Sequence, residues 1–149
     1  MNALTLLKRD HQRIKQRCAE IAAPSNNRRR KQIFDPIDAE LILHSHIEEV
    51  AFYPEMKRHE ELKDRVEESI VEHQEVAALL DEVESLQSDQ EEFQNALRDL
   101  IENVGHHIQL EEEELFPQVH ELCDETTLER LGELLNAAKG NVSERHAEL

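Results

Sequence analysis

The segment HSHIEEVAFYP, residues 44–54, decides how this 149-residue chain folds, because it returns as HIQLEEEELFP at residues 107–117. In both copies a histidine precedes a glutamate by four residues and a proline by ten. Four residues make about one turn of an α-helix, so each copy places an imidazole and a carboxylate on one helix face. The same face carries apolar residues such as Leu41 and Leu115. Ionisable pairs therefore interrupt two stripes that otherwise predict a hydrophobic core.

The repeat extends upstream to two more histidines on apolar stripes. His11 lies 33 residues before His44, and His73 lies 34 residues before His107. Both upstream histidines follow an acidic residue, in the pairs Asp10-His11 and Glu72-His73. An internal duplication of this kind predicts two structural halves related by a pseudo-twofold axis.

Apolar residues spaced in steps of three and four predict four long helices joined by short connections. We expect Pro24-Ser25-Asn26-Asn27 to end the first helix. Asp35-Pro36 is typical of a helix start, with a capping acid followed by proline. Pro54 and Pro117 are expected to kink or end the second and fourth helices. The expected helices cover residues 2–23, about 36–54, about 63–86 and about 93–117.

A fifth, short helix is expected at about residues 128–138, where leucines form an amphipathic pattern that Gly140 closes. We interpret it as a lid or an oligomer contact. Only 3 glycines, 4 prolines and 3% aromatic residues argue against a β-sandwich or barrel. The sequence thus predicts an all-α fold, an antiparallel up-down-up-down four-helix bundle with a short C-terminal fifth helix. We expect a single domain over residues 1–149, with the bundle core at about 4–120 and the C-terminal segment at about 124–140.

The chain is strongly acidic, with 17 basic against 34 acidic residues and a net charge of −17. This charge repels nucleic acids and anionic membranes, so neither is expected as a partner. No apolar run reaches the roughly 18–20 residues of a membrane span, and charged residues follow the N-terminus too closely for a secretory signal. We therefore expect a cytoplasmic protein. The basic run Arg28-Arg29-Arg30-Lys31 is interpreted as a solvated loop or as a docking patch for an acidic partner.

The two cysteines, Cys18 and Cys123, lack the CxxC spacing of redox and metal sites. We expect both to be reduced thiols, as is usual in the cytoplasm.

Six ionisable residues fall where the core is expected. A buried carboxylate without a cation is very costly, so six such positions on four helices need a common cause. A metal centre supplies it: two related halves suggest two ions, each held by two imidazoles, with both carboxylates bridging. Imidazole and carboxylate ligands without thiolate suit Fe, Mn or Zn. The candidate ligands are His11, His44, Glu48, His73, His107 and Glu111.

Neighbouring residues leave an alternative register open. His46 and His106 flank the proposed ligands, but the residues four positions after them are apolar, which favours His44 and His107. Tyr53 and Phe116 are interpreted as core residues, and the run Glu112-Glu113-Glu114 as a solvated face.

These motifs resemble the hemerythrin-like (HHE cation-binding) domain family over about residues 4–120. The order of the histidines and glutamates, their spacing and the Phe-Tyr-Pro and Leu-Phe-Pro endings all agree. The resemblance implies a non-haem di-iron centre, with two Fe ions joined by an oxo or hydroxo bridge. It also implies that His11 and His44 hold one iron, that His73 and His107 hold the other, and that Glu48 and Glu111 bridge them.

One position departs from the oxygen-carrying members of that family. Their third helix provides His-x-x-x-His, whereas the residue four after His73 is Ala77 here. We therefore expect an open coordination position, or a substitute ligand, on the second iron. This departure argues against simple oxygen carriage.

The resemblance favours a binding protein for a small diatomic ligand, dioxygen or nitric oxide, that acts in sensing, scavenging or stress protection. The alternative is a di-iron enzyme that acts on peroxide or nitric oxide or aids iron–sulfur repair, with a protein redox partner. A third possibility is iron buffering.

Overall fold

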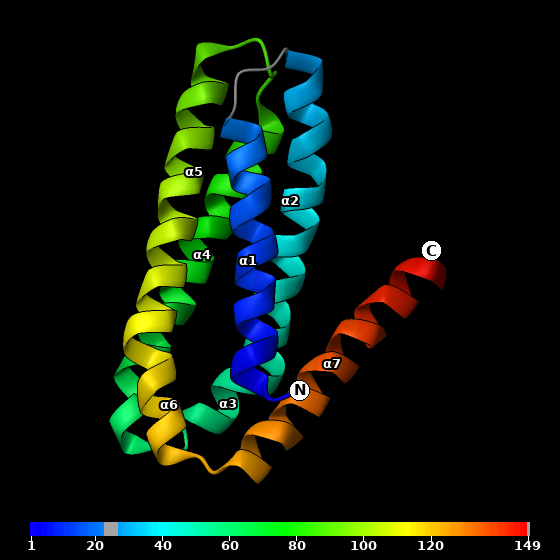
Figure 1. Ribbon diagram of the computed structural model, residues 1–149. Coiled ribbons are helices and arrows are strands. Elements are labelled where there is room, and N and C mark those ends of the chain that lie inside the picture. The colour runs from blue at the N-terminus through cyan, green and yellow to red at the C-terminus, as the bar shows by residue number, and fades with distance from the viewer. Residues whose placement is uncertain (23–26, 149) are drawn as a thin grey trace.

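Four long antiparallel helices form the body of the protein (Figure 1). The structure is a computed structural model that describes residues 1–22 and 27–148, and that part of the chain contains no strand. The helices pack in the cyclic order α1, α2, α4, α5, so each contacts two neighbours. The predicted all-α, up-down-up-down bundle is thereby confirmed. Its long helices are α1 (Ala3–Ala22), α2 (Asn27–Ile47), α4 (Lys63–Ser85) and α5 (Glu91–Leu110).

Short segments follow α2 and α5 at the same end of the bundle. Both α2 and α5 pass into a π-helix that begins at a glutamate, and then into a short α-helix with proline in its first turn. The regular α-helix gives way to a π-helix at Glu48 and at Glu111, six residues before Pro54 and Pro117. The prolines, which were expected to kink or end these helices, instead stand in the first turn of the short α-helix that follows, where a missing N–H is tolerated. These segments are η1 (Glu48–Phe52), α3 (Tyr53–Met56), η2 (Glu60–Leu62), η3 (Glu111–Leu115) and α6 (Phe116–Leu122).

The second helix begins earlier than the sequence predicts. It starts at Asn27, so the basic run at residues 28–31 is helical and not a loop, and Pro36 lies inside the helix. The lost backbone hydrogen bond is tolerated because Phe34 and Ile37 are buried on either side of Pro36. The turn expected at residues 24–27 falls largely outside the described residues.

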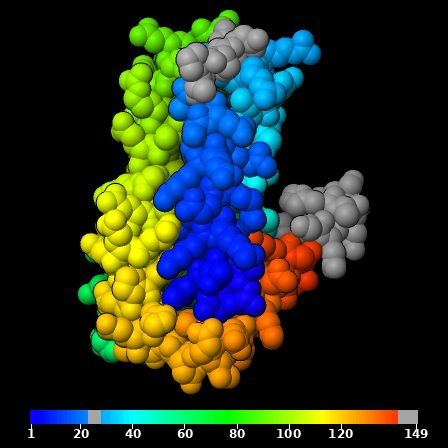
Figure 2. Space-filling model, viewed as in Figure 1, coloured from blue at the N-terminus to red at the C-terminus, as the bar shows by residue number. Residues whose placement is uncertain are grey.

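The C-terminal helix α7 (Glu125–Glu148) is longer than predicted and continues through Gly140. It runs obliquely along the lower half of the bundle and contacts α1 and α2 (Figures 1 and 2). Its buried leucines belong to the same core cluster as Ala3 of α1. The apolar face of α7 therefore packs on the bundle of its own chain at this end. The buried leucines are Leu128, Leu131 and Leu135.

The core consists of two apolar clusters with a polar layer between them. One cluster lies at the end covered by α7 and includes Leu7, Phe52 and Phe116. The other lies toward the opposite end and includes Ile14 and Phe34. The buried histidines on the four long helices, and the buried glutamates at the first positions of η1 and η3, fall between the members of these clusters. No helix in the described ranges is long and apolar enough to cross a membrane.

Candidate metal centre

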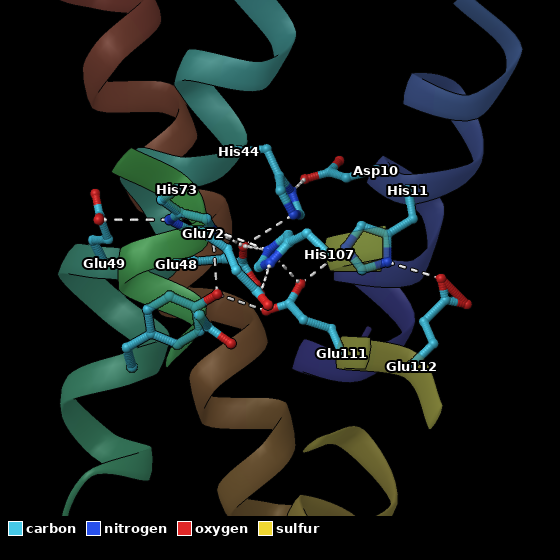
Figure 3. A network of polar contacts seen from close by, with 12 residues as sticks. Asp10, His11, His44, Glu48, Glu49, Glu72, His73, His107, Glu111 and Glu112 are labelled. Carbon is cyan, nitrogen blue, oxygen red and sulfur yellow. Dashed lines mark hydrogen bonds and ion pairs between the residues drawn. The ribbon is translucent and has the colours of Figure 1, made fainter. Parts of the chain in front are cut away.

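All six predicted site residues are buried and meet in the polar layer between the two apolar clusters (Figure 3). Glu48 and Glu111 are completely buried, with 0% exposure. Each stands at the first position of a π-helix, where the long helix ends. His46 and His106 are exposed and lie outside this buried layer, so the structure favours His44 and His107 as the candidate ligands.

The six residues form two groups of three, each with ligand atoms within 4.8 Å of one another. One group contains His11, His44 and Glu111, and the other contains Glu48, His73 and His107. The histidines are grouped in the same pairs that the family resemblance implies. Every group draws on at least three helical segments, so the packing of the bundle fixes the arrangement.

Both glutamates contact imidazoles of both groups. Glu48 Oε1 lies 3.1 Å from Nε2 of His44 and 3.1 Å from Nε2 of His73. Glu111 Oε1 lies 3.2 Å from Nε2 of His11 and 3.4 Å from Nε2 of His107. Carboxylates in this position are able to share two cations.

Unpaired polar atoms at the centre of the site fit a bound cation. Glu48 Oε2 is buried and has no hydrogen-bond partner within the described chain. His44 Nε2 lies 3.1 Å from Glu48 Oε1 but is likewise without a well-directed hydrogen bond. A buried polar atom without a partner costs roughly 1–3 kcal/mol, and more when it is charged. A metal ion between them would satisfy both atoms, and imidazole with carboxylate is a donor set that suits Fe, Mn or Zn.

Without metal, protons supply the positive charge in this layer. Burial lowers the pKa of His44, but the Glu48 carboxylate and the hydrogen bond to Asp10 outweigh it and raise the pKa to about 10. Burial disfavours the charged form of Glu48, yet the nearby imidazoles hold the pKa of Glu48 well below its usual range. A metal cation that replaces these protons would likewise supply positive charge to the buried carboxylates.

A second layer of carboxylates surrounds the imidazoles, one for each histidine. His44 Nδ1 donates to Asp10 at 3.0 Å, His11 Nδ1 to Glu112 at 2.9 Å and His107 Nδ1 to Glu72 at 2.6 Å. Glu49 lies 3.5 Å from His73 Nδ1. Such contacts orient imidazoles so that Nε2 faces the metal, as in carboxylate–histidine–metal triads.

Sequence reasoning missed this second layer. Glu112 was interpreted as part of a solvated face, but it is half-buried and accepts a hydrogen bond from His11. Its neighbours Glu113 and Glu114 are exposed, as that interpretation expected. The repeat contained the signal, because every outer carboxylate is adjacent in sequence to a candidate ligand. The adjacent pairs are Asp10-His11, Glu48-Glu49, Glu72-His73 and Glu111-Glu112.

Tyr53 and Phe116 are core residues as predicted, but they differ at the site. The Tyr53 hydroxyl donates to Glu111 Oε2 at 2.6 Å and lies 3.2 Å from His73 Nε2. Phe116, in the corresponding place of the other half, stacks parallel to His11 with ring centroids 5.8 Å apart. Burial, with the charges of Glu111 and Glu48, raises the pKa of Tyr53 well above its usual value. The two halves of the site are therefore not chemically equivalent.

Ala77 is exposed and lines a surface groove between α2 and α4 that also reaches His73. The groove has a volume of about 340 Å³, and Glu49 and Leu41 lie in its wall. The small side chain at position 77 thus leaves an opening beside the second group of candidate ligands.

Comparison with known proteins agrees with this site. The Hemerythrin HHE cation binding domain family matches residues 2–119. The crystal structure of a hemerythrin HHE cation binding domain-containing protein from Mycobacterium kansasii is similar, with a TM-score of 0.82 and 25% identity over 97% of this chain and 91% of that one. A curated DNA nickase from Nostoc sp. is 23% identical over 145 residues, which are 97% of this chain but only 41% of the nickase.

Proposed function

This chain belongs to the hemerythrin HHE cation-binding domain family, and on that premise we propose that it is a non-haem di-iron protein that binds dioxygen or nitric oxide. The observation that carries the proposal is the pair of buried His/Glu groups, joined by two carboxylates that contact both groups. In this proposal His11, His44 and Glu111 hold one iron, and His73, His107 and Glu48 hold the other. Glu48 and Glu111 bridge the two ions.

When bound, a reduced iron pair supplies electrons and an open coordination position for a small diatomic ligand. The two apolar clusters lie on either side of the candidate ligands and would limit the access of bulk water to them. The outer carboxylates accept hydrogen bonds from Nδ1 of His11, His44 and His107 and leave Nε2 of these histidines directed inward. The groove at Ala77 supports entry of a small molecule next to His73. Sensing, scavenging and stress protection are the roles that fit this chemistry.

An enzyme that acts on peroxide or nitric oxide, or that aids iron–sulfur repair, is the second candidate, and Tyr53 favours it. Its buried hydroxyl holds a proton 2.6 Å from Glu111 Oε2, inside the site. Its raised pKa keeps the proton on the oxygen, so the hydroxyl can donate a hydrogen bond that stabilises charge developing on a reduced small molecule. Such an enzyme needs a protein redox partner as a source of electrons. Iron buffering remains a third candidate.

We do not propose nucleic acid as a partner. The net charge of −17 repels phosphate backbones. This chain spans less than half of the DNA nickase that it resembles, so the activity in that name belongs to a protein with other regions. Two buried free cysteines are consistent with the reducing cytoplasm that we propose as its location.

Two measurements test the proposal. Elemental analysis of protein produced in iron-replete medium should find about two iron atoms per chain. The optical spectrum of the anaerobically reduced protein should then change when oxygen, and separately nitric oxide, is added. Reversible change favours a binding protein, and multiple turnovers with a reductant favour the enzyme. One tightly held ion, zinc alone, or no response to either gas would contradict the proposal.

A further inference from the structure

Asp10 connects the metal centre to the C-terminal helix. Its side chain is almost fully buried, and Oδ2 accepts the hydrogen bond from His44 Nδ1. Its other oxygen, Oδ1, contacts Lys139 Nζ of α7 and the guanidinium of Arg13. A helix outside the four-helix bundle therefore contacts the carboxylate that orients a candidate metal ligand.

The corresponding carboxylate of the other half is held differently. Glu72 accepts from His107, and its cation is Arg65, which lies seven residues earlier on the same helix, 3.0 Å from Glu72 Oε1. The repeat pairs Asp10 with Glu72, so the counterpart of Arg65 in the first half is Ala3. Ala3 is completely buried and carries no charge. The first half thus has no cation at the position, seven residues before the carboxylate, that Arg65 occupies in the second half.

The packing of α7 brings a replacement to this place. Gly132 lies against the N-terminal backbone so closely that a Cβ there would overlap the carbonyl oxygen of Met1 and lie 3.1 Å from Ala3 N. Lys139 follows Gly132 by seven residues, as Asp10 follows Ala3. Because α1 and α7 are in contact, the equal spacing of seven residues on both helices places Lys139 beside Asp10. Lys139 therefore takes the role toward Asp10 that Arg65 has toward Glu72.

Arg13 also reaches Asp10, but from the exposed side. Its side chain is 54% exposed, against 21% for Lys139, so solvent screens the Arg13 pair more strongly. Lys139 also lines a small pocket of about 30 Å³ that borders Asp10 and His44. A space of that size holds about one water molecule, and loss of the lysine would open it to more.

We propose that Lys139 is a positioning residue of the metal centre: it fixes Asp10, and through Asp10 the imidazole of His44, so that α7 completes the first half of the site. This inference rests on the proposed role of His44 as a metal ligand. It makes α7 part of the functional site and not only a cover of the apolar core.

The test is iron release to a ferrous chelator from full-length, anaerobically loaded protein. Lys139→Met keeps the aliphatic stem and removes the ammonium group; we expect one of the two ions to leave about 3- to 10-fold faster and the other at the wild-type rate. Asp10→Asn should accelerate the same ion by at least about 10-fold, the range known for the outer partners of ligating histidines. Lys139→Arg should restore a rate within about twofold of wild type.

A matched control separates positioning from docking of α7. Arg130 on the same helix pairs with Glu55 at 3.2 Å without contacting a site residue, so Arg130→Met should leave both release rates unchanged. Equal release from Lys139→Met and Arg130→Met would overturn the inference. So would additive effects of Lys139→Met and Asp10→Asn in the double variant, because Lys139 would then act independently of Asp10. Wild-type protein that retains no iron would contradict the proposed function itself, and the inference with it.

Discussion

Tyr53 donates a hydrogen bond of 2.6 Å to Glu111, a glutamate from the other half of the duplicated structure. The corresponding residue, Phe116, makes no such bond and stacks on His11. This hydroxyl group is therefore one difference between the two similar halves, and it restrains one of the two carboxylates that contact both groups of histidines.

Replacing Tyr53 by Phe should loosen metal binding without disturbing the fold. The ring stays in the core, whereas Glu111 loses a hydrogen bond to a charged acceptor, an interaction worth about 1.5–3 kcal/mol. We expect iron release to a chelator to accelerate by about 10-fold, with metal-free thermal unfolding within a few degrees of wild type. Release at the wild-type rate would show that the hydroxyl does not restrain Glu111 in the loaded protein.

Removal of the metal should lower stability substantially. An ion that binds only the folded state, at 1,000 times its Kd, adds about 4 kcal/mol, which corresponds to roughly 8–16 °C in the unfolding temperature of a chain of this size. Tyr53 is the only tyrosine and the chain has no tryptophan, so its fluorescence reports directly on occupancy of the site. Titration of metal into the metal-free protein should quench this fluorescence and raise the unfolding temperature together.

Glu48→Gln provides the matched test of that expectation. It removes the charge of a fully buried carboxylate, so the shift in unfolding temperature on metal addition should fall by at least half. Glu113→Gln alters an exposed glutamate in η3 and should keep the full shift. Identical shifts in both variants would mean that the cation binds elsewhere.

The fold was predictable from the sequence because each apolar stripe covers one face of one helix. The histidines and glutamates stood out for the same reason, since each interrupts a stripe. The outer carboxylates could not be recognised in this way, because an acidic residue next to a ligand has the sequence pattern of a solvated face. Glu112 is an example. The direction of the Tyr53 hydroxyl depends on a π-helix that a 3.6-residue period does not reveal. The early start of α2 was missed because Asp35-Pro36 has the pattern of a helix start although Phe34 is already buried in the helix.

Alkaline pH should destabilise the protein partly through Cys18. Burial raises the pKa of the Cys18 thiol from 9.0 to about 11. A raised pKa means that the folded state favours the protonated thiol. Its contribution to stability is therefore complete below pH 9 and is lost as the pH rises toward 11. Two pKa units correspond to an upper value of about 2.7 kcal/mol.

Urea unfolding at pH 8 and pH 10.5 measures this effect, with Cys18→Ala as the reference that cancels other titrating groups. The loss of stability between the two pH values should be about 1–2 kcal/mol smaller in the variant. In addition, a thiol reagent at pH 8 should modify Cys18 at least 10-fold more slowly in the folded wild-type protein than in the urea-unfolded protein. Rapid modification of the folded protein would show that the thiol is not held in the core.

The opening at Ala77 yields the sharpest test of the second half of the site. Ala77 lies one helical turn after His73, and its exposed position in the groove leaves room for a larger side chain. Ala77→His should place a third imidazole beside the iron held by His73 and His107, while Ala77→Gln fills the groove to a similar extent with a poor ligand. We expect the reduced Ala77→His protein to be oxidised by oxygenated buffer at least about threefold more slowly than wild type, and to respond less to nitric oxide, in stopped-flow absorbance measurements. Ala77→Gln should change these rates by less than about twofold.

Equal slowing in both variants would mean that the groove controls access and that the coordination at His73 is already complete. Rates unchanged from wild type in both variants would contradict the open position itself, and would leave the protein chemically closer to the oxygen carriers that have histidine at this place.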